Sequence, residues 1–125
     1  MIDPGALIEQ ADRIRDQLDK DPDDPMLWFG LGRIFLSLGL PGEAIMPFLA
    51  ATKLDPEYTA AYRDLGRAHL DCGETSEAAR IFAHAITLAE KAGDCQTGRE
   101  IHVFLKQAEK HGDSSPTESR PTESR

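Results

Sequence analysis

Apolar residues recur at spacings of three and four along the chain, in segments that short turns separate. One segment carries Leu27, Leu31, Ile34, Phe35 and Leu38, and the next carries Ile45, Phe48, Leu49 and Thr52. Residues with this spacing lie on one face of an α-helix, so each segment is predicted to be an amphipathic helix. Pro47 falls inside the second segment, where we expect a local kink rather than a break.

The same pattern returns after 34 residues. Residues 25–58 align without a gap on residues 59–92, and the identical pairs include Leu31/Leu65, Gly32/Gly66, Ala44/Ala78 and Phe48/Phe82. A glycine in the middle of a helix costs about 1 kcal/mol relative to alanine. Because both copies accept this cost, we expect a neighbouring helix to approach closely at each glycine.

These residues resemble the tetratricopeptide repeat (TPR), a 34-residue unit with the signature W-x2-L-G-x2-Y, then A-x3-F, then P. The first copy supplies Trp28, Leu31, Gly32, Phe35, Ala44, Phe48 and Pro56. The second supplies Tyr62, Leu65, Gly66, Ala78 and Phe82, and it departs from the signature at His69 and at Glu90, where proline is usual. The resemblance implies an all-α fold, a right-handed α-solenoid of antiparallel helix hairpins with about six helices. Without that proline, the second helix of the second copy is expected to continue to about Gly93.

The flanks of the two repeats extend the predicted solenoid to residues 1–112. Residues 5–20 and 95–111 have amphipathic stripes and are predicted to be the N-terminal and C-terminal capping helices. Residues 113–125 contain Pro-Thr-Glu-Ser-Arg twice and no apolar residue, so we expect a disordered tail. A tether and an artificial extension remain open interpretations of this tail.

Charge and composition narrow the classes of partner. The net charge is -8, and no basic run could neutralise phosphates, which argues against nucleic acid and anionic membranes as ligands. No apolar stretch is long enough to span a bilayer, and the first residues lack the basic and apolar regions of a secretory signal. Two cysteines, Cys72 and Cys95, do not make a disulfide framework. We therefore expect a cytoplasmic protein with reduced thiols.

The concave face of the solenoid is the expected binding site, because the first helix of each repeat lines it. Helical spacing selects the candidate partner-binding residues Met26, Phe29, Arg33, Leu36, Arg63, Asp64, Arg67 and Leu70. We expect the last helix to add Asp94, Thr97, Ile101 and Leu105. Arginines pair with carboxylates, and exposed methionine and phenylalanine offer adaptable apolar anchors. The predicted ligand is a protein or peptide, with an acidic or C-terminal segment favoured. Alternatively, the arginines pair only with neighbouring acids and solubilise the face.

One subclass of TPR domains holds C-terminal carboxylates with a clamp of Lys, Asn and Arg. The matching positions here hold Phe29, Arg33, Asp64, Asp94 and Gly98. Only Arg33 keeps the positive character, so the resemblance does not carry this clamp over.

Catalytic and metal chemistry has little support in the sequence. His69 and Cys72 lie one helical turn apart, but no third and fourth ligand follow at a recognisable spacing. We expect His69 to be a core residue, and we expect no enzyme activity, metal or cofactor. The favoured function is an adaptor that is a monomer or a weak homo-oligomer. One alternative is a self-associating scaffold, which an exposed Val103 would favour, and another is a regulatory subunit.

Overall fold

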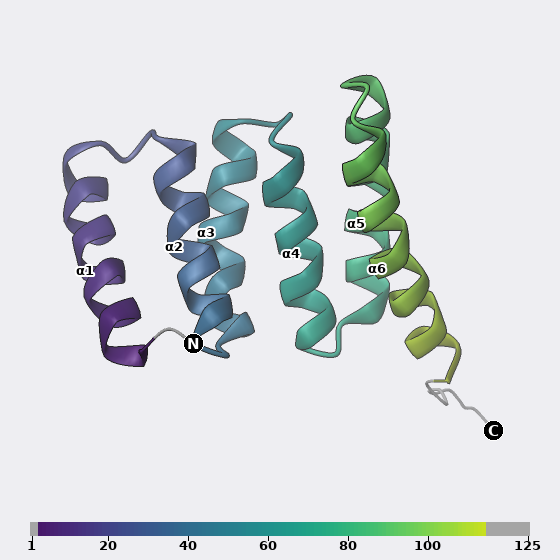
Figure 1. Cartoon of the computed structure of the whole chain (residues 1–125), viewed down its shortest axis with the longest axis horizontal. Coiled ribbons are helices and arrows are strands. Elements are labelled where there is room, and N and C mark those ends of the chain that lie inside the picture. Colours follow the sequence, from purple (N-terminus) through teal and green to yellow (C-terminus); the bar gives the residue numbers. More distant parts are fainter. Residues whose placement is uncertain (1–2, 115–125) are drawn as a thin grey trace.

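The chain is a row of helices, as a computed structural model of residues 3–114 shows. Within these residues there are six helices and no strand. They are α1 (Pro4–Lys20), α2 (Pro25–Ser37), α3 (Pro41–Leu54), α4 (Thr59–Asp71), α5 (Thr75–Lys91) and α6 (Cys95–Ser114). Successive helices run antiparallel and follow one another across the molecule, with α1 and α6 at its two ends (Figure 1). The predicted all-α solenoid of helix hairpins is confirmed.

Local sequence signals determine where several helices begin and end. Proline occupies the first turn of α1, α2 and α3. The side chain of Asp24 accepts a hydrogen bond from the backbone N–H of Met26 at 2.9 Å, which caps α2. Gly39 and Gly73 follow α2 and α4 with φ angles of 75° and 82°, a region that favours glycine. The hairpin turns therefore follow from residues close to them in the chain.

Each repeat packs a phenylalanine of its second helix over a glycine of its first. A Cβ atom added to Gly32 would lie 2.5 Å from the ring of Phe48, and one added to Gly66 would lie 2.5 Å from the ring of Phe82. Both rings are fully buried. The close approach predicted at the two glycines is confirmed, since any larger residue would overlap the ring.

The second repeat ends differently from the first. Helix α3 has 14 residues and continues through Pro47 without a break, whereas α5 has 17 and ends at Lys91. This extension follows the prediction made from Glu90. Helix α6 then begins at Cys95, 36 residues after the start of α4 at Thr59, so it is displaced by two residues from the 34-residue register. Residues 115–125 of the predicted disordered tail lie outside the described residues, and its residues 113 and 114 belong to α6.

Candidate partner-binding face

Three arginines from two neighbouring helices surround one buried carboxylate. The side chain of Asp64 is only 1% exposed, and its oxygens lie 3.4 Å from Nη1 of Arg33, 3.1 Å from Nε of Arg63 and 3.9 Å from Nη1 of Arg67. Arg33 belongs to α2, and the other three residues belong to α4. We call the surface of α2, α4 and α6 around these arginines the arginine face.

The burial of Asp64 corrects its predicted role. It was expected to face a partner, but a side chain that its own protein covers cannot contact one. A buried carboxylate requires charged or hydrogen-bonding partners, and the arginines provide them. Asp64 therefore draws the arginines of two repeats to one place.

The arginines keep part of their surface for other contacts. The exposed fractions of the side chains are 54% for Arg33, 43% for Arg67 and 20% for Arg63. Arg63 also lies 3.8 Å from a carboxylate oxygen of Glu100 on α6. The expectation that the arginines pair with neighbouring acids is thus met in part. Three guanidinium groups nevertheless face two carboxylates, which leaves one excess positive charge on the face of a protein whose net charge is -8.

Aromatic rings hold the two more exposed arginines. The guanidinium carbon of Arg33 lies 5.8 Å from the centre of the Phe29 ring, and that of Arg67 lies 5.2 Å from the centre of the Phe104 ring. Phe29 is itself half-buried and packs against Tyr58, with ring centres 5.0 Å apart. Stacking of this kind restricts the orientation of a guanidinium group without using its hydrogen-bond donors.

Two hollows meet at Arg67. A hollow of about 180 Å³ is lined by Arg33, Leu36, Ser37 and Arg67, where α2 and α4 are neighbours. A hollow of about 310 Å³ is lined by Arg63, Arg67, Glu100, Val103 and Phe104, where α4 and α6 are neighbours. Arg67 lines both hollows, so a basic group lies between them.

The comparison with protein families agrees with this geometry. Residues 11–58 and 48–94 match the model of the tetratricopeptide repeat family. The chain belongs to the TPR family. A TPR repeat-containing protein of Pseudomonas aeruginosa, PA0015, is 29% identical to this TPR chain over 104 residues, which are 83% of the chain and 96% of that protein.

Solved structures with the same arrangement of helices include other TPR proteins. The TPR2B domain of yeast Sti1 has a TM-score of 0.80 at 19% identity, and the match covers 85% of each chain. PcrH has a TM-score of 0.80 at 19% identity over 86% of this chain and 82% of its own. BPP2914 of Bordetella parapertussis has a TM-score of 0.73 at 23% identity over 89% of this chain and 96% of its own. At these identities the likeness shows the shared TPR fold.

The last helix of this TPR chain presents other residues than the sequence predicted. Ile101 was expected to face inward to a partner, but it is fully buried. Glu100, Val103 and Phe104 line the hollow instead. The physical reason is the two-residue displacement of α6, which turns its faces relative to those of α2 and α4. Glu90 was the signal for this displacement, because it predicted the extension of α5.

Three further predicted residues occupy different environments. Met26 is exposed at the start of α2, where a partner can reach it. Leu70 packs against the core between α5 and α6 and is only partly exposed. Asp94 caps α6, because its carboxylate accepts hydrogen bonds from the hydroxyl of Thr97 at 2.6 Å and from its backbone N–H at 3.1 Å. These bonds hold the pKa of the Asp94 carboxyl below its usual value.

The residues considered for metal or thiol chemistry have structural partners. Nδ1 of His69 lies 2.7 Å from a carboxylate oxygen of Glu74, and the side chain is mostly buried. Partial desolvation, helped by the nearby Glu74 and Asp71, raises the pKa of the Cys72 thiol, which lowers its thiolate fraction. Across residues 3–114, no three His, Cys, Asp or Glu side chains form a group that could hold a metal ion. None of the helices in that range is both long and apolar enough to cross a membrane.

Proposed function

We propose that this TPR protein is an interaction module that binds an acidic segment of another protein on its arginine face. The observation that carries the proposal is the convergence of Arg33, Arg63 and Arg67 within 4 Å of one buried carboxylate. This convergence produces a local positive excess in an acidic protein. The proposed partner is a protein or peptide, and neither nucleic acid nor a membrane.

The free edges of the arginines suit carboxylates. A guanidinium group has five N–H donors and can hold a carboxylate with two of them. Asp64 takes one donor from each arginine in the contacts described, and Arg33 and Arg67 retain 54% and 43% of their side-chain surface. Two ligand carboxylates could thus contact two arginines without displacing Asp64.

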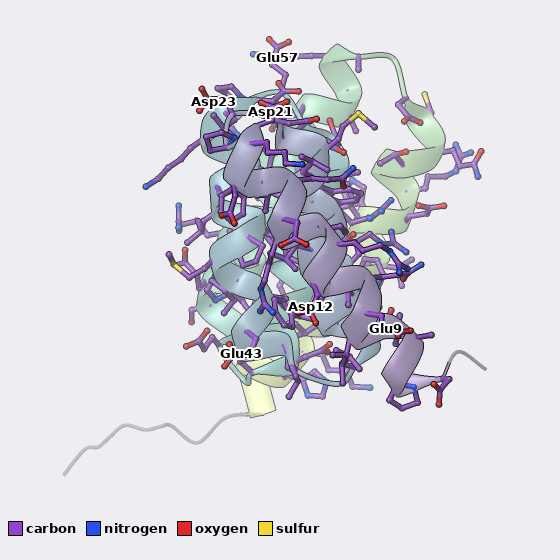
Figure 2. The ribbon with its side chains drawn as sticks, turned by 90° about the vertical axis from the view of Figure 1, so that its left-hand side faces the viewer. Glu9, Asp12, Asp21, Asp23, Glu43 and Glu57 are labelled. Atoms are coloured by element: carbon purple, nitrogen blue, oxygen red, sulfur yellow. The ribbon has the colours of Figure 1, made fainter. Side chains whose placement is uncertain are left out.

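The overall negative charge does not oppose such binding at close range. Residues 3–25 contain eight acids and three bases, a net charge of -5, and α1 with most of these charges lies at one end of the molecule. Glu9, Asp12, Asp21 and Asp23 extend outward at that end (Figure 2). Charges separated by more than about 8 Å are largely screened at physiological ionic strength. The local excess of arginine therefore determines which ligand the face attracts.

Apolar contacts supply the second part of the proposed recognition. Val103 is 56% exposed and lies beside Phe104 in the larger hollow, where both can contact an apolar side chain of the ligand. Exposure of Val103 was expected for a self-associating scaffold, but its place in the hollow accounts for it equally well. We infer a ligand with acidic residues next to a leucine or an aromatic residue.

Proteins with the same fold support this choice of ligand class. The Sti1 TPR2B domain was solved in a complex with pHsp70, and PcrH with the chaperone binding region of PopD. A TPR solenoid of this size can thus accommodate a segment of another protein. The lysine and asparagine positions of the C-terminal carboxylate clamp hold other residue types here, so we do not extend the proposal to that mode of binding.

Binding of two labelled peptides would test the proposal. One peptide combines glutamate with leucine, and the other replaces each glutamate by lysine. We expect only the acidic peptide to bind, with an affinity that falls as salt is raised, because exposed charged contacts are screened. The variant Arg33→Glu with Arg67→Glu should abolish both this binding and the capture of partners from a lysate.

A matched control separates the arginine face from net charge. Arg80→Glu with Lys91→Glu makes the same change of charge on exposed positions of α5. This control should bind the acidic peptide with nearly unchanged affinity, and both variants should retain their helix content by circular dichroism. Equal binding by the wild-type protein and the Arg33/Arg67 variant would contradict the proposal.

A further inference from the structure

A second surface of the molecule lies at its other end, along α1. In the two complete repeats, three residues of the second helix are fully buried, and the phenylalanine among them covers the glycine of the first helix. They are Ala44, Phe48 and Ala51 in α3, and Ala78, Phe82 and Ala85 in α5. Helix α1 has the position of a second helix, because Pro22 follows it 34 residues before Pro56. The equivalent positions in α1 hold Gln10, Ile14 and Gln17. Two glutamines thus replace two buried alanines.

The side of α1 that carries these residues is open. Among the described helices, only α2 packs against α1. A groove of about 620 Å³ lies between them, lined on α1 by Gln10, Arg13, Ile14, Asp16 and Gln17. Gly30 of α2 forms part of its floor, and a Cβ atom added there would lie 3.5 Å from Cδ1 of Ile14. The groove therefore has an apolar centre and a polar rim. It lies where the first helix of a repeat would pack against α1.

We propose that this groove receives α1 of a second copy of the chain, which gives a homodimer with two-fold symmetry. In an antiparallel pair of identical helices, residues at equal distances from the symmetry axis lie opposite each other. With the axis between Ile14 and Arg15, Arg13 of one copy lies opposite Asp16 of the other. The Ile14 side chains of the two copies then lie next to the axis.

The pairs that this symmetry produces are complementary in chemistry. Arg13 and Asp16 carry opposite charges, and the symmetry makes the pair twice. The two Ile14 side chains would meet at the centre over the glycine floor. A self-complementary set of this kind is what an interface between identical surfaces requires.

The acidic surroundings make Arg13 the decisive residue. Glu9 and Asp12 extend from the same end of the molecule (Figure 2), and Arg13 is the one basic residue among those that line the groove. Two such ends carry charge of the same sign and repel each other when they are in contact, so we expect a weak, reversible dimer. Its register would depend on the two Arg13–Asp16 pairs, because they are the charged contacts that attract.

Charge reversal of these two residues tests the proposal by sedimentation equilibrium at physiological ionic strength. The wild-type chain should form a reversible dimer. Arg13→Asp and Asp16→Arg should each raise the dissociation constant about tenfold or more, because each replaces two attractions by two repulsions. The double variant Arg13→Asp with Asp16→Arg restores opposite charges and should dimerise about as well as the wild type.

The control distinguishes specific pairing from general repulsion. Asp19→Arg changes charge by the same amount as Asp16→Arg, but Asp19 is exposed and does not line the groove. Asp16→Arg and Asp19→Arg both reduce the negative charge of the α1 end. If repulsion between the two acidic ends governed association, both variants would dimerise more strongly than the wild type. The proposal requires opposite effects, with Asp16→Arg weakening the dimer and Asp19→Arg leaving it intact or stronger.

Three results would overturn the proposal. The first is a wild-type chain that stays monomeric at the highest soluble concentration, including the case in which a helix of a different protein fills the groove. The second is a dimer that single charge reversals do not weaken. The third is a double variant that remains monomeric while circular dichroism shows native helix content.

Discussion

The two complete repeats share one contact between a buried ring and a glycine, and they differ on their outer faces. In residues 25–58, the ring of Phe48 covers Gly32, and in residues 59–92 the ring of Phe82 covers Gly66, with the same 2.5 Å between the ring and the place that a Cβ atom would take. The contact between the buried ring and the glycine thus holds the same residues in both repeats. The physical reason is that a fully buried ring tolerates little change of shape in what it contacts.

Positions on the arginine face differ between the repeats. Phe29 and Gly30 of α2 correspond to Arg63 and Asp64 of α4 in the 34-residue register. The second repeat therefore supplies the buried carboxylate, and Arg33 of the first repeat reaches across to it. Helix stacking thus depends on the residues that the two repeats share, whereas the charge of the arginine face depends on the residues that differ between them.

The largest expected effect concerns the shared interior. We expect Phe48→Ala and Phe82→Ala each to lower the free energy of unfolding by about 3–5 kcal/mol, because each removes a fully buried ring and leaves a cavity. Urea denaturation would measure both losses. A large loss at one site and almost none at the other would show that the repeats are not equivalent in packing.

The glycines test the same contact from the opposite side. Gly32→Ala and Gly66→Ala should both destabilise, since the added methyl overlaps a buried ring. Gly42→Ala is the matched control, because a Cβ atom at this helical position meets nothing within 4 Å. It should be neutral or stabilising by up to about 1 kcal/mol, in line with helix propensity.

An intermediate effect is expected at the position where the repeats differ in charge. Asp64→Ala should lower the free energy of unfolding by about 1–2 kcal/mol, because hydrogen bonds to a charged group are lost while the arginines can still reach water. Asp64→Asn keeps the shape and removes the charge, so it should be milder and should bind the acidic peptide more tightly. Calorimetric titration measures this affinity, and weaker binding by the asparagine variant would contradict the proposed competition for the arginines.

The smallest expected effect concerns the difference between the start of the second repeat and the start of the last helix. No side-chain cap is present at α4, whereas Asp94 caps α6 through Thr97. Because the pKa of Asp94 is lowered in the folded chain, its contribution to stability is present above its unfolded pKa and is lost as pH falls through the folded pKa.

This linkage predicts a pH-dependent difference between variants. Asp94→Ala should be less stable than the wild type near neutral pH, and the difference should shrink below about pH 4. Thr97→Ala, which keeps the carboxylate and removes the donor hydroxyl, should show part of the same loss. Urea denaturation at several pH values measures it, and a constant difference across the range would exclude this ionic contribution.

Much of the fold could be predicted from local and periodic features. The 34-residue match predicted the hairpins, Gly32 and Gly66 predicted the close packing, and Glu90 predicted the longer α5. These features are encoded within one helix or between neighbouring helices. Helical spacing also predicted most of the candidate residues on α2 and α4, because this spacing decides which residues of a helix share a face.

The sequence by itself therefore determined the type of fold, the order of the helices and the presence of arginines on adjacent first helices. Only the tertiary structure decided that Asp64 is buried among those arginines and that Ile101 is hidden while Glu100 and Val103 line the hollow. The reason is that periodicity assigns a residue to a face of its helix, but burial depends on how neighbouring helices are rotated and displaced. Because α6 begins two residues late, its faces are shifted by more than half a turn from the 34-residue register, and a prediction that keeps this register places Ile101 on the wrong face.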